Sequence, residues 1–345
     1  MEKVGIGDAG KLAHVVKGRV DPARLTLFTI VRNELGFLPA WLAHHRSIGF
    51  EQFLIFDDGS DDGTGDFLAA QSDVIVMGSE LRFGDLLLYC DPEGVTRQER
   101  AGTYFKIALP HLFFDGAYVG YVDADEFLIL PSGVASIADV VARLETEGAP
   151  SAVASVVEFF PTDASGLAGD LPNSFDALLA AYPWFQPEQL VRLQTGEQPT
   201  IIGKSKTARL FDRFKVAPRI ERKGWHRLWM PRKVREAQGF QKSPRHKTPI
   251  VRRDAGSWLT GSHYANLAPS SSVLLGVAHF VFTAQFADKI ARARAWGAHA
   301  NGAAKYGYYA ELLDRIAGVE RGFLDEQSQR YTGPEDFMKA GLMRW

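Results

Sequence analysis

The feature that most constrains this chain is an alternation of short apolar runs with a helix-like stretch near its start. Leu25–Val31 is an aliphatic, β-branched run that predicts a buried strand, and apolar residues at helical spacing follow from Leu38 to Ile48. Phe53–Phe56 and Val74–Met77 repeat the short apolar pattern. Strands that alternate with helices favour right-handed crossovers and a parallel sheet. We therefore expect an α/β fold.

Polar clusters stand where three of the expected strands end. Residues 32–34 follow the first strand, residues 57–63 follow the second, and residues 123–126 follow the apolar part of Ala117–Leu130. In open parallel sheets, ligands bind beyond the carboxyl ends of the strands. The three clusters should therefore converge on one crevice.

Asp123 and Asp125 are the most informative pair in these clusters. In extended chain, side chains two residues apart share a face, so both carboxylates can point to one place beyond the strand. Such oxygens suit a hard cation such as Mg²⁺ or Mn²⁺. We expect both to lie at the surface and to contribute little to the core. The alternative is a solvated acidic turn without function.

Two other motif families fit less well. A calcium loop of the EF-hand type starting at Asp58 would need a Glu where the chain has Ala69. A phosphatase of the haloacid dehalogenase type would need Thr or Val where the chain has Phe127.

Three blocks of the sequence together resemble a bacterial family 2-like glycosyltransferase of the GT-A fold with a DxD motif. They are TIVRNELGFLPAWLAHHRSIGFEQFLIFDDGSDDGT at 29–64, RQERAGTYFKIALPHLFFDGAYVGYVDADEFLIL at 97–130, and HFVFTAQFADKIARARAWGAH at 279–299. The resemblance implies a Rossmann-like, mostly parallel sheet flanked by helices. The helical periodicity after Asp288 adds a C-terminal helical extension, in which Tyr306, Tyr308 and Tyr309 are expected to pack rather than to line a site.

The resemblance also implies roles for individual residues. Asp58 would hold the base of a nucleotide-diphosphate sugar, most simply a UDP-sugar, and Asp123 and Asp125 would hold Mn²⁺ or Mg²⁺ on its diphosphate. His279 would complete the metal site. The remaining residues expected to contact the nucleotide sugar are Arg32, Asn33, Glu34 and Asp57, with Lys247 assisting at the diphosphate.

The implied reaction transfers a sugar to an acceptor hydroxyl, with inversion at the anomeric carbon, and needs a base. Glu158, at the end of the expected strand Val153–Val157, is the first candidate, and Asp163 is the second. A strand-end Glu that faces water is the alternative for Glu158. His263 is expected to be a core residue. The acceptor would be a glycan or a lipid-linked sugar.

Two other functions stay open. One is a catalytically idle relative that binds nucleotide or carbohydrate. The other is a nucleotidyltransferase, although TIVRNE lacks the glycine-rich signature expected there.

A basic tract, residues 204–253, contrasts with the formal net charge of −2, because it holds 17 Lys or Arg against 3 acids. Most of these cations are expected to be solvated. The tract could also steer an anionic donor or contact anionic lipid, with the aromatic residues Phe211, Phe214, Trp225 and Trp229 at the interface. Nucleic acid is not expected, because no recognition motif accompanies the charge.

Four segments are expected: a leader (1–22), a nucleotide-sugar-binding half (23–150), an acceptor-side half (151–285) and C-terminal helices (286–345). The N-terminus lacks the apolar stretch of a signal peptide, and Cys90 is the single cysteine. We expect a cytoplasmic protein, either free or peripheral at the inner face of the membrane.

Overall fold

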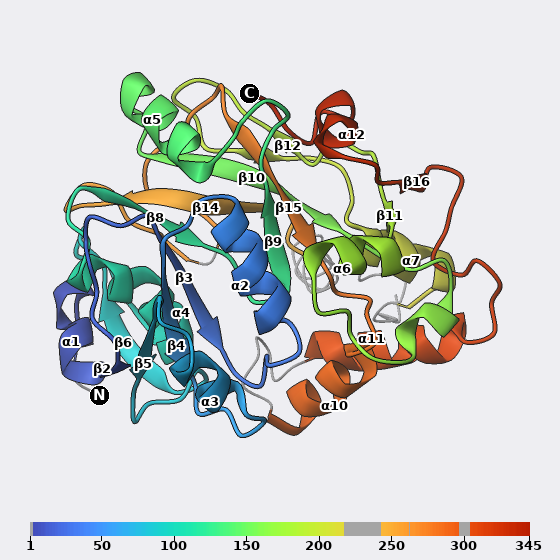
Figure 1. Cartoon of the computed structure of the whole chain (residues 1–345), viewed down its shortest axis with the longest axis horizontal. Coiled ribbons are helices and arrows are strands. Elements are labelled where there is room, and N and C mark those ends of the chain that lie inside the picture. Colours follow the sequence, from blue (N-terminus) through green and yellow to red (C-terminus); the bar gives the residue numbers. More distant parts are fainter. Residues whose placement is uncertain (1–2, 217–242, 262, 297–303) are drawn as a thin grey trace, which may run out of the picture.

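A nine-stranded sheet, in the order β2-β5-β4-β3-β8-β14-β10-β15-β9, runs through the molecule (Figure 1). The computed structural model describes residues 3–216, 243–261, 263–296 and 304–345. The strands of this sheet are β2 (His14–Lys17), β3 (Thr26–Val31), β4 (Gln52–Asp57), β5 (Val74–Gly78), β8 (Ala117–Tyr121), β9 (Glu126–Ile129), β10 (Ser151–Glu158), β14 (His246–Arg253) and β15 (Leu274–His279).

The sheet is mixed, but most of its strands share one direction. The pairs β5–β4, β4–β3, β3–β8 and β10–β15 are parallel. Strand β14 lies between β8 and β10 and is antiparallel to both, so β10 and β15 run in the direction of β8. The edge strands β2 and β9 are antiparallel to their neighbours. One edge of the sheet therefore collects the carboxyl ends of six strands and the amino ends of β2, β9 and β14.

Both faces of the sheet are buried, which explains why its strands are apolar at successive positions. In β3, Leu27 and Val31 belong to one core cluster and Phe28 to the other. The first cluster includes residues of α2 (Leu38–Ser47) and α5 (Ile137–Glu147), and the second includes residues of α4 (Ala101–Ala108). Helix α2 crosses in front of the sheet in Figure 1.

A third core cluster joins three helices beside the sheet: α7 (Lys206–Phe214), α10 (Phe286–Trp296) and α11 (Ala304–Ile316). Helices α10 and α11 lie together at the lower right of Figure 1. The other helices are α1 (Ala9–Leu12), α3 (Thr64–Ala69), α6 (Phe175–Ala181) and α12 (Pro334–Lys339). A smaller three-stranded sheet joins β1 (Lys3–Val4), β6 (Leu86–Cys90) and β7 (Thr96–Arg100). Two further strand pairs are β11 (Trp184–Phe185) with β16 (Gln329–Arg330), and β12 (Val191–Arg192) with β13 (Thr200–Ile201).

The structure confirms the α/β class, the first strands and helix, and the C-terminal helices. It differs at 117–130, where the carboxylate segment separates two strands: β8 ends at Tyr121, and β9 begins at Glu126 on the far edge of the sheet. Strand β2, in the stretch expected to be a leader, pairs with β5. The main sheet also crosses the expected boundary at residue 150, because β8 pairs with β14.

Candidate active site

A pocket of about 620 Å³ lies at the edge of the sheet where the parallel strands end. Seven residues expected from the sequence to bind donor or metal line it: Arg32, Asn33, Glu34, Asp58, Asp123, Asp125 and His279. They follow or end β3, β4, β8 and β15. The structure therefore brings the three polar strand ends together, as the parallel arrangement predicts.

The loops after β3 and β4 are tied to each other. Asn33 adopts a left-handed backbone conformation with φ of 56°, and its side-chain amide donates to Asp61 Oδ1 at 2.7 Å and accepts from the Asp61 N–H at 2.8 Å. Asp57 Oδ1 accepts from the N–H and the hydroxyl of Ser60. Asp57 thus holds the turn and is not among the described residues that line the pocket, in contrast to the expectation.

Asp58 is buried at the pocket wall, and one of its two oxygens accepts no hydrogen bond from the described residues. Its Oδ1 accepts from the N–H of Phe83 at 2.8 Å, whereas Oδ2 has no hydrogen-bond partner among the described residues. The Arg32 guanidinium is 3.6 Å from Oδ2 and donates to the Asp58 carbonyl. Burial raises the pKa of Asp58, although these donors oppose the shift. A buried acceptor oxygen in a pocket wall is ready for a ligand N–H.

Asp123 is bound by two lysines. Lys106 of α4 and Lys247 of β14 reach its two oxygens at 3.2 and 2.8 Å, and the Tyr121 hydroxyl also donates to it. Burial alone would raise the pKa of Asp123, but the two ammonium groups hold it well below its usual value. Lys247 also contacts Glu126 and is fully buried. It therefore supports Asp123 from within the protein and is not among the described pocket-lining residues.

Asp125 forms a different set of contacts. Its Oδ2 is bonded to the Lys289 ammonium of α10 and lies 3.5 Å from His279 Nε2. The carboxyl group is buried, which would raise its pKa, yet Lys289 and His279 hold that pKa below its usual value. Burial would lower the pKa of His279, but Asp125 raises it.

These contacts decide which residues can hold a cation. The part of the chain that the structure describes contains no group of three or more His, Cys, Asp or Glu side chains arranged around a metal position. Asp125 Oδ2 and His279 Nε2 are close enough to share one ion, and water and phosphate could supply its other ligands. Both oxygens of Asp123 already accept from ammonium or hydroxyl donors, so a ligand role for Asp123 stays a prediction.

The two candidate bases lie elsewhere. Glu158 ends β10 as expected, but it is buried, and its two oxygens accept from the N–H and the hydroxyl of Thr207 at 2.6 Å each. It thereby caps the first turn of α7. Asp163 accepts from the N–H and the hydroxyl of Ser165. Neither is among the described pocket-lining residues, so the assignment of the base stays a prediction.

Among the pocket-lining residues that sequence reasoning missed, five have charged or aromatic side chains: Phe83, Lys106, Lys289, Arg292 and Tyr306. Tyr306 was expected to pack between helices, and it does pack against the third core cluster, but it also lines the pocket. Tyr309 does pack in the third core cluster, whereas His263, which was expected in the core, is only partly buried and donates from Nδ1 to the His246 carbonyl. Lys106 and Lys289 stand inside two blocks of the resemblance, but their helical spacing does not mark them as pocket residues.

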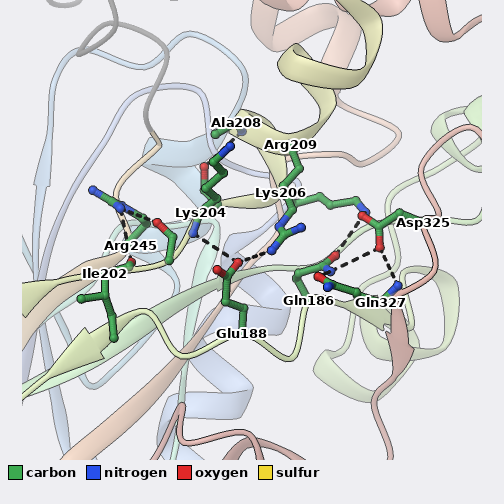
Figure 2. A network of polar contacts seen from close by, with 12 residues as sticks. Gln186, Glu188, Ile202, Lys204, Lys206, Ala208, Arg209, Arg245, Asp325 and Gln327 are labelled. Carbon is green, nitrogen blue, oxygen red and sulfur yellow. Dashed lines mark hydrogen bonds and ion pairs between the residues drawn. The ribbon is translucent and has the colours of Figure 1, made fainter. Parts of the chain in front are cut away.

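The basic tract is less solvated than expected where the structure describes it. Lys206 is buried and pairs with Asp325, and Arg209 pairs with Glu188 (Figure 2). Phe211 is 1% exposed in the third core cluster, so it cannot face a membrane. Trp225, Trp229 and the other residues from 217 to 242 lie outside the described residues.

These features define the class: an α/β protein with a charged ligand pocket at the carboxyl edge of its sheet. No protein-family model matches the chain. Over 127 residues it is 28% identical to a glycosyltransferase family 92 protein from Ricinus communis, a likeness that covers 37% of this chain. The same alignment spans about a fifth (21%) of that relative's own length. Among the described helices, none is long and apolar enough to cross a membrane.

Proposed function

We propose that this protein is a metal-dependent glycosyltransferase of the GT-A fold, similar to family 2 enzymes, that moves a sugar from a nucleotide-diphosphate sugar to an acceptor hydroxyl. One observation carries the proposal: Asp58, which follows β4, Asp125, in the segment after β8, and His279, at the end of β15, line one pocket. The family 92 name of the Ricinus communis relative supports the transferase class.

Asp58 is assigned to the nucleotide base. Its Oδ2 is a buried acceptor without a hydrogen-bond partner among the described residues, and such an atom is costly unless a ligand or water donates to it. Uracil presents a ring N–H that meets this requirement. Uridine is therefore the nucleoside that we assign to the donor.

The charge of the pocket supports the use of a divalent ion. Four cationic side chains line it, namely Arg32, Lys106, Lys289 and Arg292, and four acidic ones, namely Glu34, Asp58, Asp123 and Asp125. The described lining is thus close to neutral and has little spare positive charge for a diphosphate. An ion on Asp125 and His279 would offset the charge that develops on the leaving diphosphate. Lys106 and Arg292 would orient the phosphates beside it.

In the proposed reaction, the acceptor hydroxyl oxygen forms a bond to the anomeric carbon while the bond from that carbon to the diphosphate oxygen breaks. The hydroxyl proton passes to a protein base, and the electron pair of the broken bond stays on the diphosphate. Glu158 and Asp163 keep the assignment as candidate bases. A glycan or lipid-linked sugar is the proposed acceptor, and the cytoplasm or the inner membrane face is the proposed location.

The test is direct titration of the protein with UDP and UDP-sugars, with and without Mn²⁺, by calorimetry, followed by a transfer and hydrolysis assay. Asp58→Ala should weaken UDP and uridine binding alike, and Asp125→Ala should remove only the Mn²⁺-dependent part. Asp170→Ala, at an exposed loop position, is the matched control. Failure of every nucleotide to bind would refute the proposal. Binding without transfer or hydrolysis would favour the catalytically idle relative.

A further inference from the structure

The two aspartates of the motif differ in how firmly their lysine partners are fixed. The side chains of Lys247 and Lys106, which hold Asp123, are 0% and 9% exposed. The side chain of Lys289, which holds Asp125, is 28% exposed. A buried ammonium that leaves its carboxylate loses its charge partner without gaining water, whereas a partly exposed one can turn to solvent. Only the Asp125 pair is therefore readily broken.

Lys289 also stands where a cation would bind. Asp125 Oδ2 is shared between the Lys289 ammonium and the edge of the His279 ring, so the ammonium competes for the oxygen that would ligate an ion. An ion and the ammonium cannot occupy that position together, because like charges at such a separation repel strongly.

The surroundings of Lys289 permit the side chain to move alone. Helix α10 is anchored by Phe286 and Ile290, which are buried in the third core cluster. The lysine stem is long and flexible, so its ammonium can leave Asp125 while the helix backbone stays in place. Glu34 and Lys289 line the same pocket, and the charge of Lys289 opposes the rise that burial causes in the pKa of Glu34.

We propose that Lys289 is an exchangeable counter-ion that occupies the cation position on Asp125 and is displaced when a divalent ion binds. Asp123 keeps both of its lysines throughout. The displaced ammonium remains in the pocket, where it meets Glu34 or the phosphates of the donor. The proposal rests on the proposed function for the identity of the donor, but the competition itself concerns only the protein and the ion.

The experiment measures Mn²⁺ affinity by calorimetry, without nucleotide, for the wild type, Lys289→Gln, Lys289→Arg and Arg292→Gln. Removal of the competing ammonium should tighten Mn²⁺ binding about tenfold in Lys289→Gln, the factor that corresponds to about 1.4 kcal/mol. Lys289→Arg keeps the charge and should bind within about threefold of the wild type. Arg292→Gln makes the same charge change on the same helix and pocket, and should also stay within about threefold because it measures only the long-range effect.

Equal or weaker Mn²⁺ binding by Lys289→Gln would overturn the inference, as would an equal gain in Arg292→Gln. The two proposals can also be separated. If Lys289→Gln alone gains tenfold in Mn²⁺ affinity while the wild type binds no nucleotide, the inference is supported and the proposed function is refuted. If neither the wild type nor Lys289→Gln binds Mn²⁺, both the inference and the metal dependence of the proposed function fail. Circular dichroism verifies that each variant is folded.

Discussion

Asp123→Asn should destabilise the fold, although the sequence alone suggested a dispensable surface carboxylate. The substitution removes the only carboxylate that contacts the Lys106 ammonium within the described residues and one of two that contact Lys247. Removing one partner of a buried ion pair typically costs about 3–5 kcal/mol. Lys247 keeps Glu126, and the Asp123 side chain is 36% exposed, so screening reduces the loss. We expect about 2 kcal/mol.

Asp125→Asn makes the same chemical change two residues away and serves as the matched control. Its partner Lys289 is 28% exposed, so the freed ammonium reaches water and the expected loss is at most about 1 kcal/mol. Urea denaturation followed by circular dichroism gives both free energies of unfolding at the same pH. Asp123→Asn/Lys106→Met should recover part of the loss, because it removes the ammonium group that Asp123→Asn leaves without a carboxylate, whereas Lys247 keeps Glu126. A larger loss in Asp125→Asn than in Asp123→Asn would refute this reasoning.

Two further predictions concern other carboxylates. Burial raises the pKa of Glu34 from 4.5 to about 7, so its contribution to stability is fully present below pH 4.5 and is lost as the pH rises towards 7. The free energy of unfolding of Glu34→Gln should lack this decline, so the wild-type curve should fall relative to the variant curve between pH 4.5 and 7. Two curves of equal slope in that range would contradict the shift. Glu158→Gln should lower the free energy of unfolding by about 1 kcal/mol through the weakened cap on Thr207, with Mn²⁺ affinity unchanged; loss of transfer at unchanged stability would instead support a base role.

The sequence predicted the parts of the site that local pattern determines. A strand buried on both faces shows as a continuous apolar run, and polar residues after such a run must lie at its carboxyl end. This is why Asp58 and Asp125 were placed correctly in one crevice with Asn33. The direction of the strands, and therefore the shared edge, follows from the helical crossovers.

The pattern could not show which residues approach from other elements. Lys106 and Lys289 come from helices, and nothing in their helical spacing distinguishes a pocket-facing lysine from a solvated one. Lys247 comes from β14, which runs antiparallel, so its first residues reach the edge where the other strands end. Glu158 was placed correctly at a strand end. Its hydrogen-bond partner, Thr207, comes from α7, which the local sequence pattern around Glu158 could not show.

The near balance of charge in the pocket has a consequence for the order of binding. A divalent ion alone, or a diphosphate alone, gives the pocket an excess of positive or of negative charge. When both are bound, their charges largely cancel. Each should therefore strengthen the binding of the other, and linkage requires the two factors to be equal. We expect UDP to raise Mn²⁺ affinity by at least about tenfold, and Mn²⁺ to raise UDP affinity by the same factor, both measured by calorimetry. Uridine lacks the phosphates and should raise Mn²⁺ affinity by less than about twofold. Equal effects of uridine and UDP would show that the ion does not meet the diphosphate, and would place it away from Asp125 and His279.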